Sequence, residues 1–457
     1  MTEINSYIDD HLEESIALLG DYVKLPSVSA QKQAIPETAA FVKTMLESLG
    51  ATADVLEKET SGHPVVVGEL QGDSPYTLLM YNHYDVQPPE PLELWKSPPF
   101  EMTRYEDKAF GRGISDNKAH LVSRLLAIRA VREAHGGKLP ITIKFLIEGD
   151  EEIGSAKLLE FVQRYHERLS ADVALSEGGG INSAGRPIIS LGVRGVLHVE
   201  LRARTALSDL HSSMGNVVPN AAWRLVWALA AIKDPDDNVL IPGFYDAVRP
   251  PTPEEDALLR AVPSEEDTVL TSLGLREFIG GARGYDYQRR IAFWPACTID
   301  GMGGGYQGPG SKTVIPAEAS AKIDFRLVPD QTPDDITSKL RKHLDAQGFS
   351  EIEVTAEEGE FPARSDATHP FVGVVAGSAR EVYGEEPIVL PNAAGTQPLY
   401  PMMHALGVPF ASAGLSYFAG RAHAPNENIR IADFIAGTRH VAAIIQRLPV
   451  LARSHAD

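Results

Sequence analysis

Four short apolar runs, rich in β-forming residues and each followed by a polar segment, restrict the fold of this 457-residue chain more than any other feature. Stretches with apolar residues at helical spacing separate most of these runs. Strands that alternate with helices in this way are typical of an α/β fold in which helices sandwich one sheet. The predicted strands cover residues 64–70, 76–81, 141–147 and 172–175, and the predicted helices cover 4–24, 36–49, 118–135 and 155–168.

Candidate chemical groups follow three of these strands within a few residues. His83 comes after the second run, Glu151 and Glu152 come after the third, and Glu177 comes after the fourth. In open α/β sheets, ligands gather beyond the carboxyl ends of the strands, so we expect these side chains to form a site. Several carboxylates at the end of a buried strand are costly unless cations compensate their charge, which indicates metal ions.

Two imidazoles and three carboxylates make up the candidate ligand set. Each of two divalent ions could take one histidine and one carboxylate, while the remaining carboxylate bridges them. Zinc is the expected metal, and the same mixture of nitrogen and oxygen ligands also accepts manganese or cobalt. The candidate metal ligands are His83, Asp116, Glu152, Glu177 and His423.

Two further carboxylates suit supporting roles. Asp85 lies two residues from His83 in an extended run, so its side chain points the same way and can receive the imidazole proton that a metal does not need. Glu151 is adjacent to Glu152 and points elsewhere, which leaves it free to take a proton from a metal-acidified water. The pattern therefore predicts a hydrolase with two metal ions and Glu151 as its general base.

Charge and composition exclude several other classes of protein. Lys and Arg number 42 against 62 Asp and Glu, a net charge of −20, which argues against a nucleic-acid partner or an anionic membrane surface. The single cysteine, Cys297, excludes an intramolecular disulfide. The N-terminus shows no basic segment followed by an apolar one, and no run is long enough to span a bilayer. We expect a soluble, cytoplasmic protein.

The sequence changes character near residue 195, which indicates a second domain. An alternating strand over 196–202 and a tryptophan-containing helix over 220–233 precede an irregular Pro- and charge-rich stretch that runs to about 290. A strand over 321–327, a helix over 333–346 and a strand over 351–356 then complete an α+β unit. If His423 shares a site with His83, this domain is an insertion. The expected boundaries are 1–193 and 363–457 for the catalytic domain and 194–362 for the inserted one.

The ordered segments around these residues resemble a dinuclear-zinc metallopeptidase family. This family includes the carnosinases, the cytosolic nonspecific dipeptidases, aminoacylase-1, acetylornithine deacetylase and succinyl-diaminopimelate desuccinylase. The resemblance extends from about residue 20 to 445, and segments 148–155 and 308–316 are most similar to the carnosinase-like dipeptidase branch. It implies a zinc-peptidase-like catalytic domain of α/β class with an inserted α+β lid and dimerisation domain.

The resemblance also implies how the candidate ligands share two metal ions. It assigns one histidine and one glutamate to each ion and gives the bridging position to Asp116. It further implies a cis peptide bond between Asp116 and Asn117, an orienting role for Asp85 and the general-base role for Glu151. The implied pairs are His83 with Glu177 and Glu152 with His423.

Other implied roles concern the substrate and a second copy of the chain. A small peptide is the implied substrate, and the inserted domain is expected to form a homodimer and to supply His211 to the other subunit's active site. Arg326 would hold the substrate's carboxylate, and His369 and Thr396 are further candidates for substrate contact. On the residues alone, the simpler interpretations are favoured for both, with His211 as a solvated histidine and Arg326 as a salt-bridge partner.

Three functions remain open at this stage. The main hypothesis is a dipeptidase that cleaves short peptides with a free C-terminal carboxylate. The alternative is a deacylase of N-acyl amino acids, of the acetylornithine or succinyl-diaminopimelate type. It is suggested by segment 392–398, which reads Asn-Ala-Ala-Gly-Thr-Gln-Pro where the dipeptidase branch usually has Arg-Glu-Gly-Gly-Ser-Ile-Pro. An inactive metal-binding interaction protein is the third, and Glu151 beside Glu152 argues against it because a binding scaffold needs no spare base.

Overall fold

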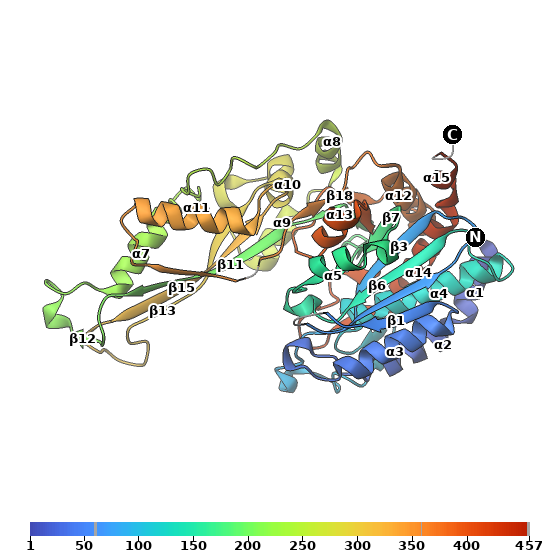
Figure 1. Ribbon diagram of the computed structural model, residues 1–457, viewed down its shortest axis with the longest axis horizontal. Helices are drawn as coiled ribbons and strands as arrows, with labels where there is room; N and C mark the ends of the chain where they lie inside the picture. The colour runs from blue at the N-terminus through green and yellow to red at the C-terminus, as the bar shows by residue number, and fades with distance from the viewer. Residues whose placement is uncertain (59–61, 358, 455–457) are drawn as a thin grey trace. The chain divides into compact units, whose positions relative to one another are not determined.

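The computed structural model describes residues 1–58, 62–357 and 359–454 (Figure 1). The chain forms two compact units. The first contains Met1–Gly192, Ser365–Pro391 and Pro398–Asp457, and the second contains Val193–Arg364 and Asn392–Gln397. Residues 392–397, which the sequence analysis placed in the last catalytic segment, therefore belong to the second unit. Two short strands, β10 (Gly192–Val193) and β17 (Ala363–Arg364), lie where the chain passes from one unit to the other.

A six-stranded sheet forms the centre of the first unit. Its strand order is β1-β2-β6-β3-β7-β19. The neighbours β6 and β3, β3 and β7, and β7 and β19 run parallel, whereas β1 and β2 continue the sheet antiparallel. All four predicted strands of this unit belong to the sheet, and the α/β class is confirmed. The strands are β1 (Thr52–Leu56), β2 (Val65–Leu70), β3 (Thr77–His83), β6 (Thr142–Glu148), β7 (Val173–Ser176) and β19 (Phe410–Ser412).

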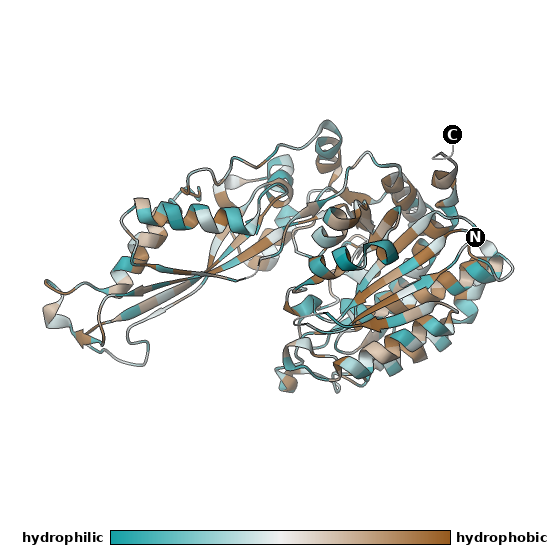
Figure 2. Ribbon diagram, viewed as in Figure 1, coloured by the Kyte–Doolittle hydropathy of each residue, from teal (hydrophilic) through white to brown (hydrophobic). Residues whose placement is uncertain are grey.

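Helices cover both faces of this sheet, and the apolar strands between them make the core. Figure 1 shows α2, α3 and α4 on one side and α5 and α13 on the other. Strand β3 is buried at every position, and Figure 2 shows the central strands as mainly hydrophobic. The helices are α1 (Thr2–Asp10), α2 (Leu12–Val23), α3 (Ile35–Ser48), α4 (Ala119–Ala134), α5 (Leu158–Arg164), α6 (His166–Leu169), α12 (Pro370–Tyr383), α13 (Tyr400–Leu406), α14 (Ile431–Arg447) and α15 (Pro449–Ser454).

Two of the helices predicted for this unit are each divided in two. The helix expected over 4–24 is α1 and α2, with a break at His11, and the helix expected over 155–168 is α5 and α6, with a break at Tyr165. The apolar spacing continues across both breaks, so periodicity alone gave no sign of them. Among the described residues, every helix is too short or too polar to cross a bilayer.

Two small sheets bring the C-terminal part of the first unit against its N-terminal part. Strand β20 pairs with β8, and β21 pairs with β5. The segment between β20 and β21, which carries His423, is thereby held at both ends. The strands are β18 (Ile388–Leu390), β9 (Pro187–Ser190), β8 (Gly180–Ile181) and β20 (Ser416–Tyr417) in one sheet, and β21 (Asn428–Arg430), β5 (Lys108–Phe110) and β4 (Thr103–Tyr105) in the other.

The second unit is an antiparallel sheet in the order β13-β15-β11-β16 with helices on one face. Helix α7 packs on β11 and β15, and α11 packs on α7. Their contact face is apolar, and Leu201, Ile323 and Phe325 are buried there. These elements are β11 (Gly195–Arg204), β13 (Ala296–Gly304), β15 (Glu318–Leu327), β16 (Glu353–Ala356), α7 (Ala221–Ile232) and α11 (Pro333–Ala346), with a separate pair β12 (Leu210–His211) and β14 (Val314–Ile315).

The stretch from residue 234 to about 290, predicted to be irregular, contains three helices after residue 252, so the prediction was wrong for that part. It contains α8 (Pro253–Ala261), α9 (Glu266–Leu273) and α10 (Gly284–Phe293). Helix α8 begins with a capping box in which Thr252 and Glu255 satisfy each other's backbone amides. Strand β13 was also missed, because it is exposed at nearly every position and three of its nine residues are glycine, so it has no hydrophobic alternation.

Candidate metal centre

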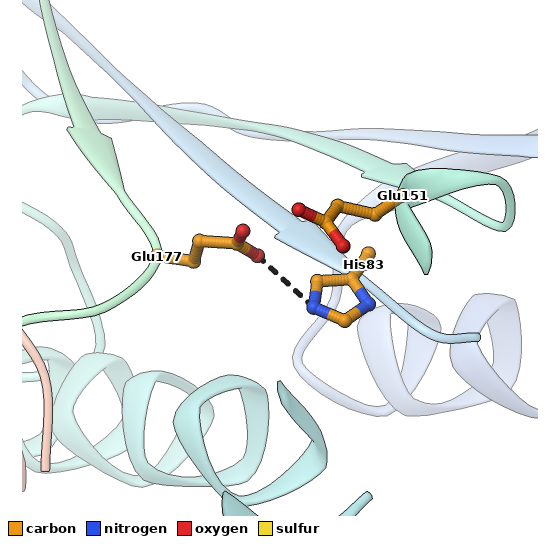
Figure 3. Close-up of side chains that lie close together, drawn as sticks. All are labelled: His83, Glu151 and Glu177. Carbon is orange, nitrogen blue, oxygen red and sulfur yellow. Dashed lines mark ion pairs between the residues drawn. The ribbon is translucent and has the colours of Figure 1, made fainter. Parts of the chain in front are cut away.

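The site lies at the carboxyl edge of the six-stranded sheet, where three parallel strands end side by side. Strand β3 ends at His83, β6 is followed by Glu151, and β7 is followed by Glu177. Figure 3 shows the two carboxylates directed toward the His83 ring. Glu177 Oε2 lies 3.3 Å from His83 Nε2 and is a buried oxygen for which the described residues supply no hydrogen-bond donor. Such an oxygen is suited to a cation.

Asp116 lies between the two predicted histidine ligands, His83 and His423. Its Oδ1 atom lies 3.0 Å from His83 Nε2, and its Oδ2 atom lies 3.1 Å from His423 Nε2. The residue belongs to a short π-helical turn, Ile114–Lys118, and the Asp116–Asn117 peptide bond is cis, which confirms the sequence-based expectation. One carboxylate thus presents one oxygen to each imidazole, which is the arrangement that a bridging ligand requires.

The second histidine completes a second group of candidate ligands. His423 Nε2 lies 3.1 Å from Glu152 Oε2, and Gln87 donates to Glu152 from its backbone amide and its side chain. The structure therefore brings all five predicted ligands together in one unit. It arranges them, with Glu151, as two groups whose ligand atoms lie within 4.8 Å of one another: His83, Glu151 and Glu177, and Asp116, Glu152 and His423.

Asp85 supports both the first histidine and the loop that follows β6. Its backbone oxygen lies 3.0 Å and its Oδ1 atom 3.3 Å from His83 Nδ1, so Nε2 is the nitrogen that faces Asp116. The two carboxylate oxygens of Asp85 also accept the backbone amides of Glu151 and Glu152, at 3.2 and 3.0 Å. A single buried aspartate thus orients one candidate ligand and fixes the backbone of another.

The protonation of the cation-free chain reflects the crowding of negative charge. Burial raises the pKa of Glu177 to about 8, and burial together with the charge of Glu177 raises the pKa of Glu151. Burial lowers the pKa of His83, but the charge of Glu177 and the contact with Asp116 outweigh it, so the net shift is upward. Hydrogen bonds to Asp116 and Glu152 raise the pKa of His423 to about 10. These residues fit two divalent cations, which would replace the protons.

Sequence reasoning missed two buried charged groups beside this centre. Lys58 Nζ donates to Glu148 Oε2 at 3.2 Å and to Asp150 Oδ2 at 2.8 Å, and all three side chains are at most 1% exposed. Glu427 accepts backbone amides of the turn that carries Asp116. Lys58 lies in a charged segment that is typical of a solvated surface, and the only signal for Glu427 is its closeness to His423 in the sequence.

The four predicted residues outside the metal centre have structural contacts of their own. In the second unit, exposed His211 accepts the backbone amide of Ser213 through Nδ1, and Arg326 donates to Thr396 Oγ1 at 2.9 Å. In the first unit, His369 caps α12 by accepting the backbone amide of Phe371. The structure brings Arg326 and Thr396 together, and the substrate contacts of all four residues stay predictions.

Replacing Lys58 with methionine should leave two buried carboxylates without their cation. We expect Lys58→Met to lower the free energy of unfolding by about 3–5 kcal/mol, measured by urea denaturation. The matched control is Lys24→Met, because Lys24 pairs with Asp21 while both side chains are more than 60% exposed. The control should change stability by less than about 0.5 kcal/mol. Equal effects of the two substitutions would contradict this account of Lys58.

Uptake of zinc by metal-free protein should release protons. At pH 7, below the pKa of about 8 for Glu177 and about 10 for His423, both groups hold a proton that a cation displaces. Calorimetric titration with zinc in two buffers of different ionisation enthalpy gives the number of protons released. We expect at least one proton per chain at pH 7. Binding without proton release would show that the imidazoles and carboxylates are not the ligands.

The chain matches the family model described as "Peptidase family M20/M25/M40" over residues 79–447. Among curated proteins, it is 28% identical to human Beta-Ala-His dipeptidase, over 99% of this chain and 93% of that protein. It is 26% identical to the Cys-Gly metallodipeptidase DUG1 of Saccharomyces cerevisiae, with 98% of each covered.

Solved structures give the same result. An M20 family metallo-carboxypeptidase from Sulfolobus solfataricus superposes with a TM-score of 0.90 at 39% identity, over 96% of this chain and 99% of that one. Human carnosine dipeptidase 1 superposes with a TM-score of 0.80 at 26% identity, over 98% and 99%. The resemblance inferred from the motifs is confirmed. This chain belongs to the peptidase family M20/M25/M40.

Proposed function

We propose that this protein is a dinuclear metal-dependent dipeptidase that cleaves short peptides with a free C-terminal carboxylate. The proposal rests on the position of Asp116. One of its carboxylate oxygens faces each imidazole, and Glu151 lies beside this group of ligands. The names of the human and yeast relatives, a Beta-Ala-His dipeptidase and a Cys-Gly metallodipeptidase, support the substrate class. A carboxypeptidase such as the Sulfolobus relative also acts at a free C-terminus.

The proposed ligand assignment follows the two groups of side chains. We assign His83 and Glu177 to one cation, Glu152 and His423 to the other, and Asp116 to both. When bound, the cations would polarise the scissile carbonyl and acidify a water. Zinc is the proposed metal, and manganese or cobalt would suit the same ligands.

Glu151 is the proposed general base. The residue is partly buried, and its backbone amide donates to Asp85, which fixes the backbone at this position. Glu151 accepts a proton from the attacking water at a carboxylate oxygen and then delivers that proton to the nitrogen of the leaving amine. Because Glu152 is engaged by His423 and Gln87, the two adjacent glutamates can have different roles.

The proposed substrate contacts come from four residues. Arg326 would hold the substrate's carboxylate, His211 would donate to the developing oxyanion in the other subunit, and His369 and Thr396 would contact substrate. Support for Arg326 comes from its ion pair with Asp324, at 3.1 Å, and its hydrogen bond to Thr396, which fix the guanidinium while leaving further N–H donors.

The proposed homodimer has support from an apolar face on the second unit. Helix α7 exposes Trp223 at 57%, Trp227 at 49% and Val226 at 40%, and the two indole rings stack with centroids 5.7 Å apart. Exposed large apolar side chains that gather on one face typically mark a protein interface. The cytoplasmic location stays a prediction.

The function is tested with purified, zinc-loaded protein on a panel of β-Ala-His, Cys-Gly, longer peptides, and N-acetyl and N-succinyl amino acids. We expect the dipeptides to be hydrolysed faster than the N-acyl amino acids by about tenfold or more in kcat/KM. Preference for the N-acyl amino acids would favour the deacylase, and preference for longer peptides would favour a carboxypeptidase. If none of the compounds is hydrolysed, the hypothesis of an inactive metal-binding protein is favoured.

The division of roles between the adjacent glutamates is tested in the same assay. Glu151→Gln should lower kcat by about 10²–10⁴-fold while the protein still binds two zinc ions, because only proton transfer is lost. Glu152→Gln is the matched control, and it should weaken zinc binding because a ligand is lost. Near-normal turnover by Glu151→Gln would remove this residue as the base.

The dimer is tested by size-exclusion chromatography with light scattering. Trp223→Glu combined with Trp227→Glu should give the mass of one chain, 49.5 kDa, where the unchanged protein gives twice that mass, because charge on the apolar face disfavours its burial. Ile279→Glu is the control, since Ile279 is also exposed in the second unit, at 59%, but lies outside α7. A dimer that survives the double substitution would contradict the proposed interface.

A further inference from the structure

A buried carboxylate outside the proposed ligand set, Glu427, contacts the turn that carries Asp116. The residue is fully buried, and each of its carboxylate oxygens accepts two hydrogen bonds. Oε1 accepts the backbone amides of Ser115, at 2.8 Å, and Asp116, at 3.0 Å. Oε2 accepts the backbone amide of Gly113, at 2.9 Å, and Arg112 Nη1, at 2.8 Å. All four donors come from five consecutive residues, so one side chain fixes the whole turn.

The same residue belongs to the segment that carries His423. Glu427 directly precedes β21, which pairs with β5, and its backbone oxygen accepts the amide of Gly111 at 3.1 Å. Three non-glycine residues just before it have positive φ angles: Arg421 at 58°, His423 at 61° and Asn426 at 64°. Such angles cost free energy and persist only when surrounding contacts enforce them. Glu427 therefore links the segment that carries His423 to the turn that carries Asp116, although the two lie more than 300 positions apart in the sequence.

A charged carboxylate at this buried position costs free energy. Burial raises the pKa of Glu427 to about 7 against the opposing charge of Arg112, which shows that the surroundings only partly compensate a negative charge. The benefit is geometric. The turn presents several N–H donors at once, and a carboxylate is the side chain that has two acceptor oxygens and no donor.

We infer that Glu427 is a positioning residue of the metal centre, whose hydrogen bonds to residues 112–116 set the spacing between Asp116 and His423. The inference rests on the proposed metal centre and adds a residue that is not itself a ligand. Asp116 Oδ2 and His423 Nε2 are 3.1 Å apart, so a small rotation of the turn would move the bridging carboxylate away from one of the two cations.

The chemistry of the four hydrogen bonds makes the inference testable with near-isosteric changes. In Glu427→Gln, one oxygen becomes an NH₂ group that faces two N–H donors, so either the pair from Ser115 and Asp116 or the pair from Gly113 and Arg112 loses its acceptor. In Glu427→Asp, the charge remains but the side chain is shorter by about 1.5 Å. Both changes should displace the turn that carries Asp116.

The second unit offers a matched control for the loss of a buried carboxylate. Glu255 is 2% exposed, accepts two hydrogen bonds from Arg249 and one from the backbone amide of Thr252, and pairs with Arg364. Glu255→Gln therefore removes a similarly buried charge that has three hydrogen bonds and one further ion pair, but from the unit that does not contain the candidate ligands.

The experiment measures zinc affinity and thermal midpoint on metal-free protein, without an activity assay. Zinc binding is followed by competition with a chromophoric chelator. We expect Glu427→Gln to weaken the binding of at least one zinc ion by about 10–100-fold, while Glu255→Gln keeps the affinity of the unchanged protein. Both variants should show a similar fall in thermal midpoint. If Glu427→Gln does not fold, Glu427→Asp takes its place with the same expectation.

Each outcome decides the question. Unchanged zinc affinity in a folded Glu427 variant overturns the inference, and so does an equal loss of affinity in Glu255→Gln, because that loss would follow from stability alone. If the unchanged protein binds fewer than two zinc ions, the proposed function fails, and the inference fails with it.

Discussion

Repulsion between carboxylates at one edge of the central sheet is the constraint on which the rest of the structure depends. Parallel strands must end at a common edge, and here the acidic residues that follow β6 and β7 meet beside His83. Water cannot screen this charge well, because Glu177 is 3% exposed and His83 is fully buried. In the chain alone, burial raises the pKa of Glu177 and hydrogen bonds to Asp116 and Glu152 raise the pKa of His423, so bound protons offset part of the negative charge. Divalent cations would relieve the repulsion more effectively. The meeting of strand ends that defines the fold therefore also creates the need for metal ions.

Buried arginine and lysine side chains around the site hold the strand ends without pairing with the candidate metal ligands. Arg124, on α4, donates to Asn82 Oδ1 and to the backbone oxygens of Tyr81 and Ser176, so it joins the ends of β3 and β7. Lys58 donates to Glu148 and Asp150 and so holds the loop that follows β6. These side chains bond to backbone oxygens, to the Asn82 amide oxygen, or to carboxylates outside the candidate ligand groups. The negative potential of the site is therefore preserved for cations from solution.

The success of the sequence-based predictions depended on how far apart the interacting residues lie in the sequence. Strands β2, β3, β6 and β7 of the first sheet, and the positions of His83 and Glu177 at strand ends, follow from local apolar patterns and were correct. His423 could be placed only through the resemblance of its segment to a family. Lys58 and Glu427 were missed, because their partners are roughly 90 and 310 positions away and a lone buried charge leaves no periodic signal. Helices α8 to α10 were missed because their charged composition hid the capping that starts α8.

The uncharged segment 392–397 bears on which substrate suits this chain. Within the second unit, this segment meets Arg326 through Thr396. Burial, and after it the neighbouring charge of Arg326, lowers the pKa of Arg194 to about 10, while the charge of Asp324 acts in the opposite direction. Segment 392–397 contains no acidic residue that could pair with these guanidiniums. Under the proposed function, a substrate that ends in a carboxylate would pair with Arg326. A free C-terminal carboxylate is common to dipeptides and to N-acyl amino acids, so the absence of charge in this segment does not favour the deacylase over the dipeptidase.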